Sequence, residues 1–400
     1  MRIAVVADDL YPGYGGQAAA TEGHIQALIS LGHEVRALAG EEQTPTQPPP
    51  GVTVERLPVW RPGEKQTHLA LPRSGKINGL LKWADVVQIN TPTPLALRAL
   101  TLARYKNVPA VMGFHTQEES AALHFSLLRG PVTVALRRWY TALYRKPDCL
   151  IAPTAFAARL VERYTPRPVH VVSNGIRLPR IGIAEEDRAD VLRRKLLDGK
   201  RHLLVNVGRL THEKRPQDLL SLALALAERR RRDWRLVVAG SGPLCRALEE
   251  RAAKLGLADE VRFLGYVPEG EKEDLLLAGD LFLMPSPTEL QSIATLEAMA
   301  RRCAVVSVDV PSSAVPEMVR EADCGLRYRP GGPDEVVHAV EQLLDHPQEL
   351  ERLQENAVVA ARPHDVNRSG EKLQEIYTGL LHDRKTSKKA SEKPLQRTSA

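Results

Sequence analysis

The chain is poor in aromatic residues, and its four cysteines lie far apart. Trp, Tyr and Phe make up 4% of 400 residues and no nucleic-acid recognition module is found, so nucleic-acid binding is not expected. Cys149, Cys245, Cys303 and Cys324 form no C-x-x-C pair, which is typical of reduced core thiols in a cytosolic protein. No apolar run approaches 18 residues, so no membrane-spanning helix is expected.

Several common functional motifs are also missing. The sequence has no D-x-D pair, no H-E-x-x-H, no Cys/His ligand cluster and no Walker A loop. We therefore expect no catalytic metal and no permanently bound cofactor. The start, Met1–Ala7, is too short and too soon acidic for a signal peptide, and it predicts a first buried strand.

The net charge of +6 is unevenly distributed. Residues 1–180 hold 21 Lys/Arg against 13 Asp/Glu, residues 181–382 hold 28 against 34, and residues 383–400 hold 6 against 2. A basic first half can indicate an anionic partner, and a membrane surface fits better than nucleic acid.

Short apolar runs alternate with helical patterns, which predicts two successive doubly wound α/β domains with parallel sheets. In the first half the expected strands are Ile3–Ala7, Glu34–Ala39, Val52–Leu57, Val86–Gln88, Ala110–Phe114, Cys149–Ala152 and His170–Val172, with a helix near Ala18–Leu31. In the second half they are Arg201–Val207, Arg235–Ala239, Val261–Leu264, Leu281–Met284 and Ala304–Val308, with helices at 215–230, 243–255, 270–278, 293–300, 312–320 and 333–345.

We place the domains at 1–178 and 179–365, followed by a C-terminal helix at 366–382 and a disordered basic tail at 383–400. Ligands of such sheets lie beyond the carboxyl ends of the strands. The expected site is therefore a cleft between the two domains.

The most informative stretch is Pro285–Ala300, which carries Glu289 and Glu297 eight residues apart. Ser292 is a good N-cap for the helix that follows, and the free amides of the helix start bind anions. A phosphate at that point, flanked by two carboxylates that accept hydroxyl groups, suits a nucleotide sugar. The alternative is an ordinary helix with a Glu in its first turn.

Two cations follow the first strand of the second half. Arg209 and Lys214, in Gly208-Arg-Leu-Thr-His-Glu-Lys214, can hold a diphosphate and stabilise it as a leaving group. The alternative for both is solvated surface.

Two glycine-rich turns follow strands. Gly13-Tyr-Gly15-Gly16 allows close approach of the backbone to a phosphate, although a simple tight turn explains it equally well. Gly240-Ser-Gly-Pro243 is interpreted as mainly structural, with Gly240 kept as a donor-binding candidate.

Gly113-Phe-His115-Thr-Gln-Glu118-Glu119 follows a strand of the first half. His115 could hydrogen-bond the transferred group, and Glu118 or Glu119 could bind an acceptor hydroxyl. A loop with solvated acids is the alternative.

The segment 127–146 interleaves basic and aromatic residues, which suits an anionic lipid interface. Its members are Arg129, Leu136, Arg137, Arg138, Trp139, Tyr140, Tyr144, Arg145 and Lys146. The alternative is a surface helix whose aromatic residues face the core.

Together these motifs resemble GT-B glycosyltransferases of family 4 from Met1 to about Leu381. The resemblance also includes Gly32-His-Glu-Val35, Ser173-Asn-Gly-Ile176, Phe263-Leu-Gly265 and the Ala-Met-Ala that follows Glu297. It implies retaining transfer of a sugar from a nucleotide donor, with an N-terminal acceptor domain, a C-terminal donor domain and a helix around Glu371–Leu381 that crosses back.

The resemblance also implies residue roles. Arg209 and Lys214 would bind the donor phosphates, Glu297 the ribose and Glu289 the transferred sugar. The amides of Ile293 and Ala294, joined across the cleft by Gly16, would contact the diphosphate, and His115 would lie near the sugar.

Two segments favour one class of acceptor. Thr288–Glu297 and Phe114–Glu119 are similar to variants in bacterial glycolipid synthases that glycosylate diacylglycerol. The sequence departs from the family at Gln291-Ser292, where Phe-Gly is usual, and at Arg301-Arg302-Cys303, where a small residue and Pro are usual.

The leading hypothesis is a cytosolic enzyme, peripheral at the inner face of the cell membrane. It would transfer a hexose, glucose or galactose from a UDP donor, to a lipid such as diacylglycerol. The alternatives are a soluble or polysaccharide acceptor, a mannosyltransferase that uses GDP-mannose, a sugar-nucleotide epimerase, or an inactive nucleotide-sugar binding protein. The oligomeric state is not predicted.

Overall fold

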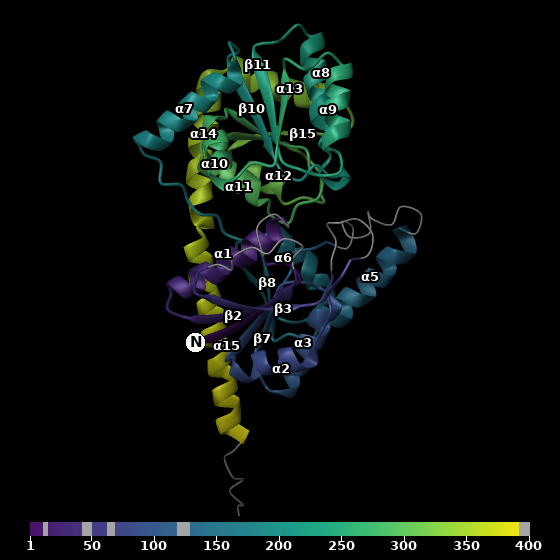
Figure 1. Cartoon of the computed structure of the whole chain (residues 1–400), viewed down its shortest axis with the longest axis vertical. Helices are drawn as coiled ribbons and strands as arrows, with labels where there is room; N and C mark the ends of the chain where they lie inside the picture. Colours follow the sequence, from purple (N-terminus) through teal and green to yellow (C-terminus); the bar gives the residue numbers. More distant parts are fainter. Residues whose placement is uncertain (11–14, 42–49, 62–68, 118–128, 392–400) are drawn as a thin grey trace, which may run out of the picture. The chain divides into compact units, whose positions relative to one another are not determined.

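The computed structural model describes residues 1–10, 15–41, 50–61, 69–117 and 129–391. It divides into two compact units, Met1–Gly175 together with the chain from Val366 onward, and Ile176–Asp365. Both units appear in Figure 1.

The first unit is built on a seven-stranded parallel sheet with the order β3-β2-β1-β6-β7-β8-β9. Its strands are mostly short apolar runs buried on both faces, as expected for a parallel sheet between helices. They are β1 (Arg2–Val6), β2 (Glu34–Gly40), β3 (Val52–Leu57), β6 (Val86–Ile89), β7 (Ala110–Gly113), β8 (Cys149–Ala152) and β9 (Val169–Val171).

Helices cover both faces of this sheet (Figure 1). They are α1 (Gly16–Ser30), α2 (Ser74–Trp83), α3 (Pro94–Tyr105), α5 (Arg129–Tyr144), α6 (Ala155–Val161) and α15 (Val366–Ser391), with a short helix η2 (Glu162–Tyr164) and a small ribbon of β4 (Val59–Trp60) and β5 (Leu69–Ala70).

Helix α15 belongs to the first unit although it ends the chain. Leu373 and Tyr377 are fully buried in one cluster with Ile3 and Val5 of β1. Tyr377 donates its hydroxyl hydrogen bond to Gln88 at the middle of the sheet. The helix runs along α1 so closely that a Cβ on Gly370 would lie 2.6 Å from the Cβ of Ala27.

The end of α15 differs from the expectation. Residues 383–391 were expected to be disordered, but they continue the helix to Ser391. Arg384 anchors this extension, because its Nη2 lies 2.8 Å from the Asp148 carboxylate and its Nη1 lies 2.9 Å from Asn107 Oδ1. Residues 392–400, also expected to be disordered, lie outside the described residues.

The second unit has a six-stranded parallel sheet with the order β12-β11-β10-β13-β14-β15. Its strands are β10 (His202–Val207), β11 (Trp234–Ala239), β12 (Val261–Gly265), β13 (Leu281–Met284), β14 (Ala304–Val308) and β15 (Gly325–Tyr328). Its helices are α7 (Ile183–Leu197), α8 (Gln217–Glu228), α9 (Cys245–Lys254), α10 (Glu269–Ala278), α11 (Ile293–Ala300), α12 (Val315–Ala322), α13 (Pro333–Asp345) and α14 (Pro347–Ala361), with η3 (His212–Lys214) and η4 (Arg362–His364).

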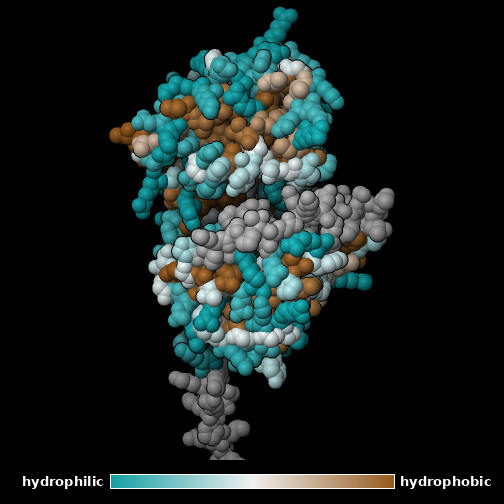
Figure 2. Space-filling model, viewed as in Figure 1, coloured by the Kyte–Doolittle hydropathy of each residue, from teal (hydrophilic) through white to brown (hydrophobic). Residues whose placement is uncertain are grey.

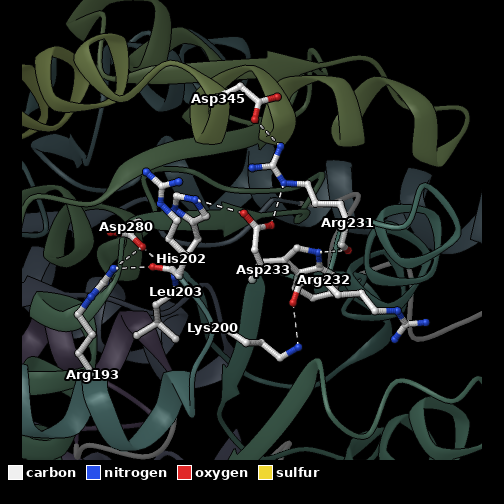
Figure 3. Close-up of polar contacts among 11 residues, drawn as sticks. Arg193, Lys200, His202, Leu203, Arg231, Arg232, Asp233, Asp280 and Asp345 are labelled. Atoms are coloured by element: carbon white, nitrogen blue, oxygen red, sulfur yellow. Dashed lines mark hydrogen bonds and ion pairs between the residues drawn. The ribbon is translucent and has the colours of Figure 1, made fainter.

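Charged residues close the amino-terminal edge of this second sheet (Figure 3). Asp280 Oδ2 accepts hydrogen bonds from the Leu203 amide at 2.7 Å and from Arg193 Nη2 at 2.9 Å. Arg231 bridges Asp233 at 3.1 Å and Asp345 at 2.7 Å. The charged groups at this edge already pair with one another. A ligand is therefore expected at the opposite edge, beyond the carboxyl ends of β10, β11 and β13.

The surface of the second unit carries exposed apolar side chains on α7. Ile183 is 80% exposed and Val191 is 59% exposed. Figure 2 shows apolar surface around the start of this helix, on the left of the second unit. Within the described ranges, no helix is both long and apolar enough to cross a bilayer.

Three of the four thiols are buried. Burial raises the pKa of Cys149 and Cys324 to about 12 and raises that of Cys303 above its usual range. Only Cys245, on α9, is partly exposed. All four thiols are free, so no disulfide cross-links these elements.

Candidate active site

One of the two predicted cations, Lys214, and one of the two predicted carboxylates, Glu289, contact each other in the second unit. Lys214, in η3 after β10, places its Nζ 2.6 Å from Glu289 Oε1. Glu289 lies after β13, which is the neighbour of β10 in the sheet, so parallel pairing brings the two loops to one edge. The Glu289 side chain is only 10% exposed and that of Lys214 is 27% exposed, so water screens this pair weakly.

Arg209 is held on the same loop. Its Nη2 lies 2.6 Å from Glu213 Oε1, and its side chain is 42% exposed. The guanidinium is therefore oriented by Glu213 and still reaches solvent, as a residue that receives an anionic ligand must.

The loop that carries these cations is fixed by backbone contacts with the glycine turn after β11. A Cβ on Gly240 would lie 1.8 Å from the Gly208 carbonyl oxygen, and one on Gly242 would lie 2.4 Å from that of Leu210. The Leu210 amide also donates to Ser241 O at 2.9 Å. Glycine is required at these positions because the two loops pack closely, which agrees with the interpretation of Gly240 as structural. A contact between Gly240 and the nucleotide-sugar donor stays a prediction.

Helix α11 begins as the sequence predicts. Ser292 caps it, because its Oγ accepts from the Thr295 amide at 3.3 Å. Its φ of 69° is unusual for a residue other than glycine, and such strain gathers at functional sites. The amides of Ile293 and Ala294 have no hydrogen-bond partner among the residues that the structure describes. Two free donors at a positive helix end are available to an anion.

Glu297, one turn into α11, is paired with a residue that the sequence interpretation missed. Lys272 of α10 places its Nζ 2.9 Å from Glu297 Oε1 and 2.9 Å from Glu269 Oε1. Burial raises the pKa of Glu297, and Lys272 offsets only part of this. Burial opposes the charge on Lys272, but the carboxylates of Glu297 and Glu269 outweigh it and raise its pKa. Both glutamates of the motif thus have a lysine partner from another element.

The two departures from the family pattern are accommodated inside the second unit. Arg301, which is 4% exposed, pairs with Glu273 of α10 at 2.7 Å. Arg302 adopts a left-handed φ of 66°, and the Cys303 thiol donates to Leu276 O at 3.0 Å. Gln291 is buried, and its Nε2 lies 3.4 Å from His364 Nδ1. These changes rebuild the end of α11 and leave its free amides in place.

His115 lies at the carboxyl end of β7 in the first unit. Its ring turns back over the strand, because a Cβ on Gly113 would lie 2.4 Å from His115 Nε2. Neither ring nitrogen has a partner in the described part of the chain, although both are enclosed. Burial, and secondarily the nearby His24, lowers the pKa of His115 to about 3. A neutral imidazole with two unused polar atoms is equipped to hydrogen-bond a ligand hydroxyl.

The remaining predicted residues of the first unit are only partly described. Gly15 is the N-cap of α1 with φ 102°, and Gly16 begins that helix, so the turn needs glycine at position 15. Gly13, Glu118 and Glu119 lie outside the described residues.

The basic helix α5 turns its aromatic residues toward the core. Tyr140 and Tyr144 are buried, and the Trp139 indole N–H donates to Pro92 O at 2.7 Å. Arg137 and Arg138 of α5 are exposed, as are Arg145 and Lys146 directly after it, and the apolar Val134 of the same helix is 54% exposed. The two tyrosines therefore face the core, as the alternative interpretation expects. Of the residues predicted to face a membrane, the four basic ones are exposed and Trp139 is only half exposed.

Comparison with known sequences decides the family. The family described as Glycosyltransferase Family 4 matches residues 14–180, and Glycosyl transferases group 1 matches residues 187–359. The chain belongs to the GT-B glycosyltransferases. Alpha-D-kanosaminyltransferase of Streptomyces kanamyceticus is 29% identical over 282 residues, which are 69% of this chain and 72% of that protein.

The names of the relatives of this glycosyltransferase indicate different acceptors. Alpha-monoglucosyldiacylglycerol synthase of Streptococcus pneumoniae is 29% identical over 231 residues, and the match spans 56% of this chain and about half, 51%, of that protein. The structure of Anabaena HepE in complex with UDP-glucose has a TM-score of 0.72 and 18% identity, and covers 95% of this chain and 100% of that one. At that identity the likeness supports the fold alone.

Proposed function

We propose that this glycosyltransferase is a retaining hexosyltransferase that uses a UDP-sugar, UDP-glucose or UDP-galactose, and a membrane lipid hydroxyl such as that of diacylglycerol. The observation that carries the donor half is the stretch Glu289–Glu297. Its two carboxylates are each paired with a lysine, and between them lie the two free amides that begin α11. The order of carboxylate, amides and carboxylate along this stretch matches the order of sugar, diphosphate and ribose along a nucleotide sugar.

Each group has a role in the transfer. The bond between the sugar's anomeric carbon and the diphosphate breaks as the bond to the acceptor oxygen forms, and the proton of the acceptor hydroxyl passes to the leaving diphosphate oxygen. Negative charge then grows on the leaving diphosphate, and Arg209, Lys214 and the amides of Ile293 and Ala294 stabilise it. Glu289 accepts from hydroxyl groups of the transferred sugar, Glu297 from the ribose, and neutral His115 from the sugar in the first unit. No metal is required for this charge balance.

The lipid acceptor is supported by separate features. The exposed cations of α5 suit an anionic membrane surface, and one relative is by name a glycolipid synthase. The enzyme would accordingly act in the cytoplasm, bound at the inner face of the cell membrane. A soluble acceptor is the second candidate, since D-inositol 3-phosphate glycosyltransferase of Thermomonospora curvata is 32% identical over 248 residues.

Release of nucleoside diphosphate from a panel of UDP- and GDP-sugars tests the proposal. Each donor is supplied with vesicles that contain diacylglycerol and anionic phospholipid, with vesicles that lack diacylglycerol, and with soluble polyol acceptors. We expect release from a UDP-hexose only where diacylglycerol is present, together with a radiolabelled glycolipid product. Release with a soluble acceptor alone contradicts the lipid assignment, and loss of a UDP-sugar with no acceptor indicates an epimerase.

Removing the two predicted phosphate cations tests the donor half. Arg209→Ala with Lys214→Ala should lower kcat/KM by more than about 100-fold, because loss of a single preorganised donor already costs that much. A matched variant, Arg251→Ala with Lys254→Ala, removes the same charge from the exposed last turn of α9, at the end of that helix away from the glycine turn, and should keep full activity. Full activity in the first variant would refute the assignment.

A further inference from the structure

We propose that Lys272 is a positioning residue for the donor: it holds the Glu297 carboxylate ionised and oriented for the ribose hydroxyls. This inference rests on the proposed function, since it takes Glu297 as the ribose ligand. Lys272 lies in α10 and Glu297 in α11, and these helices pack side by side in the second unit. Their side chains are 17% and 15% exposed, so the ion pair is largely shielded from water.

The contacts leave one half of the carboxylate for a ligand. Glu297 Oε1 accepts from Lys272 Nζ at 2.9 Å. Glu297 Oε2 has no partner among the residues described, and it is absent from the enclosed polar atoms. A carboxylate with one oxygen fixed by a cation and the other open accepts a hydroxyl in a defined direction.

The charge on Glu297 depends on Lys272. Burial disfavours the ionised carboxylate and raises its pKa, and the nearby Glu269 acts in the same direction. Lys272 is the strongest opposing group, and Arg301, at the end of the same helix, is a weaker one. Helix α14 packs on the other side of α11 with the apolar residues Ala357 and Ala361. Without Lys272, protonation of Glu297 therefore extends to higher pH, and a protonated carboxyl accepts hydroxyl hydrogen bonds poorly.

A purely structural role for Lys272 is the alternative, and the fold does not need one. Helices α10 and α11 already contribute Leu276 and Leu296 to one hydrophobic cluster. They also share a second ion pair, Arg301 with Glu273 at 2.7 Å. That second pair joins the same two helices without touching Glu297 Oε1, so it offers a matched control.

The test compares Lys272→Met, Lys272→Arg and Glu273→Gln in the full-length enzyme. Donor KM and kcat are measured from pH 6 to 9 with the active UDP-sugar, and the Kd of UDP is measured by calorimetry. We expect Lys272→Met to raise donor KM and the UDP Kd by about tenfold at pH 7 with little change in kcat, because a uniform binding interaction is lost. The deficit should shrink as the pH rises to 9, where Glu297 ionises without help. Lys272→Arg and Glu273→Gln should keep the wild-type pH profile.

Two results would overturn the inference. One is a wild-type KM and pH profile in Lys272→Met, and the other is an equal, pH-independent defect in Lys272→Met and Lys272→Arg. If Lys272→Met does not fold, Lys272→Gln replaces it with the same expectations. If the wild-type enzyme neither binds UDP nor uses any nucleotide sugar, the proposed function fails together with this inference; normal donor use with unchanged variants rejects Lys272 alone.

Discussion

The enclosed ring nitrogens of His115 predict that the first unit loses stability in mild acid. Its pKa in the folded chain is about 3, against 6.5 for an ordinary histidine. The pKa is depressed, so the unfolded chain binds the proton more readily below pH 6.5. Stability attributable to His115 is therefore complete above that value and is lost as the pH falls from 6.5 toward 3.

The magnitude follows from the two pKa values. Each pH unit within that window costs about 1.4 kcal/mol, so His115 alone should cost about 2 kcal/mol between pH 7 and pH 5. Burial also lowers the pKa of His24 in the same unit, which adds to the loss. Asp8, whose pKa burial raises, acts in the opposite direction. A comparison of variants separates His115 from both.

The assay is urea unfolding at pH 7 and pH 5, in wild type and in His115→Asn, which has no titratable group at this position. Both proteins carry Trp234→Phe, so that emission comes only from Trp60, Trp83 and Trp139 of the first unit. Wild type should lose about 2 kcal/mol more than His115→Asn between the two pH values. Equal losses would show that His115 titrates normally and that the enclosure of its ring nitrogens does not lower its pKa.

Two further predictions concern glycines. Gly370→Ala should destabilise the first unit by about 1–3 kcal/mol, because its Cβ would lie 2.6 Å from that of Ala27; Gly379→Ala on the same helix meets nothing within 4 Å and should stabilise it by about 0.5–1 kcal/mol. Thermal melts of the pair check this, and equal shifts would contradict the close packing of α15 on α1. Gly240→Ala puts a Cβ 1.8 Å from the Gly208 carbonyl oxygen, so it should displace the cationic loop and lower both the melting temperature and donor affinity, measured by scanning calorimetry and UDP titration.

Buried parallel strands were predictable because each is a short apolar run between helices. Leu281–Met284 and Ala304–Val308 match β13 and β14 residue for residue. Strand β15 was missed because Gly325–Tyr328 is an edge strand with a charged Arg327 in its middle. Helix α7 was missed for a related reason: within Ile183–Leu197 only Ala189 and Leu196 are buried, so its apolar period is weak.

The candidate site was predictable where one segment carries its groups, as with Ser292 as the cap of α11. It was not predictable where the partner comes from another element. Lys272 stands in an ordinary acidic and basic helix sequence, and only the packing of α10 on α11 brings it to Glu297. The direction of Trp139 likewise depends on the Pro92 carbonyl, which is distant in the sequence.

The placement of α15 affects how the polypeptide can fold during synthesis. The second unit, Ile176–Asp365, is one continuous segment and is translated whole before α15. The first unit lacks Leu373 and Tyr377, two fully buried members of its core, until the last helix has been translated. The half that is made first is thus completed last, so a premature stop near residue 365 would leave its sheet with an uncovered apolar face that is open to aggregation.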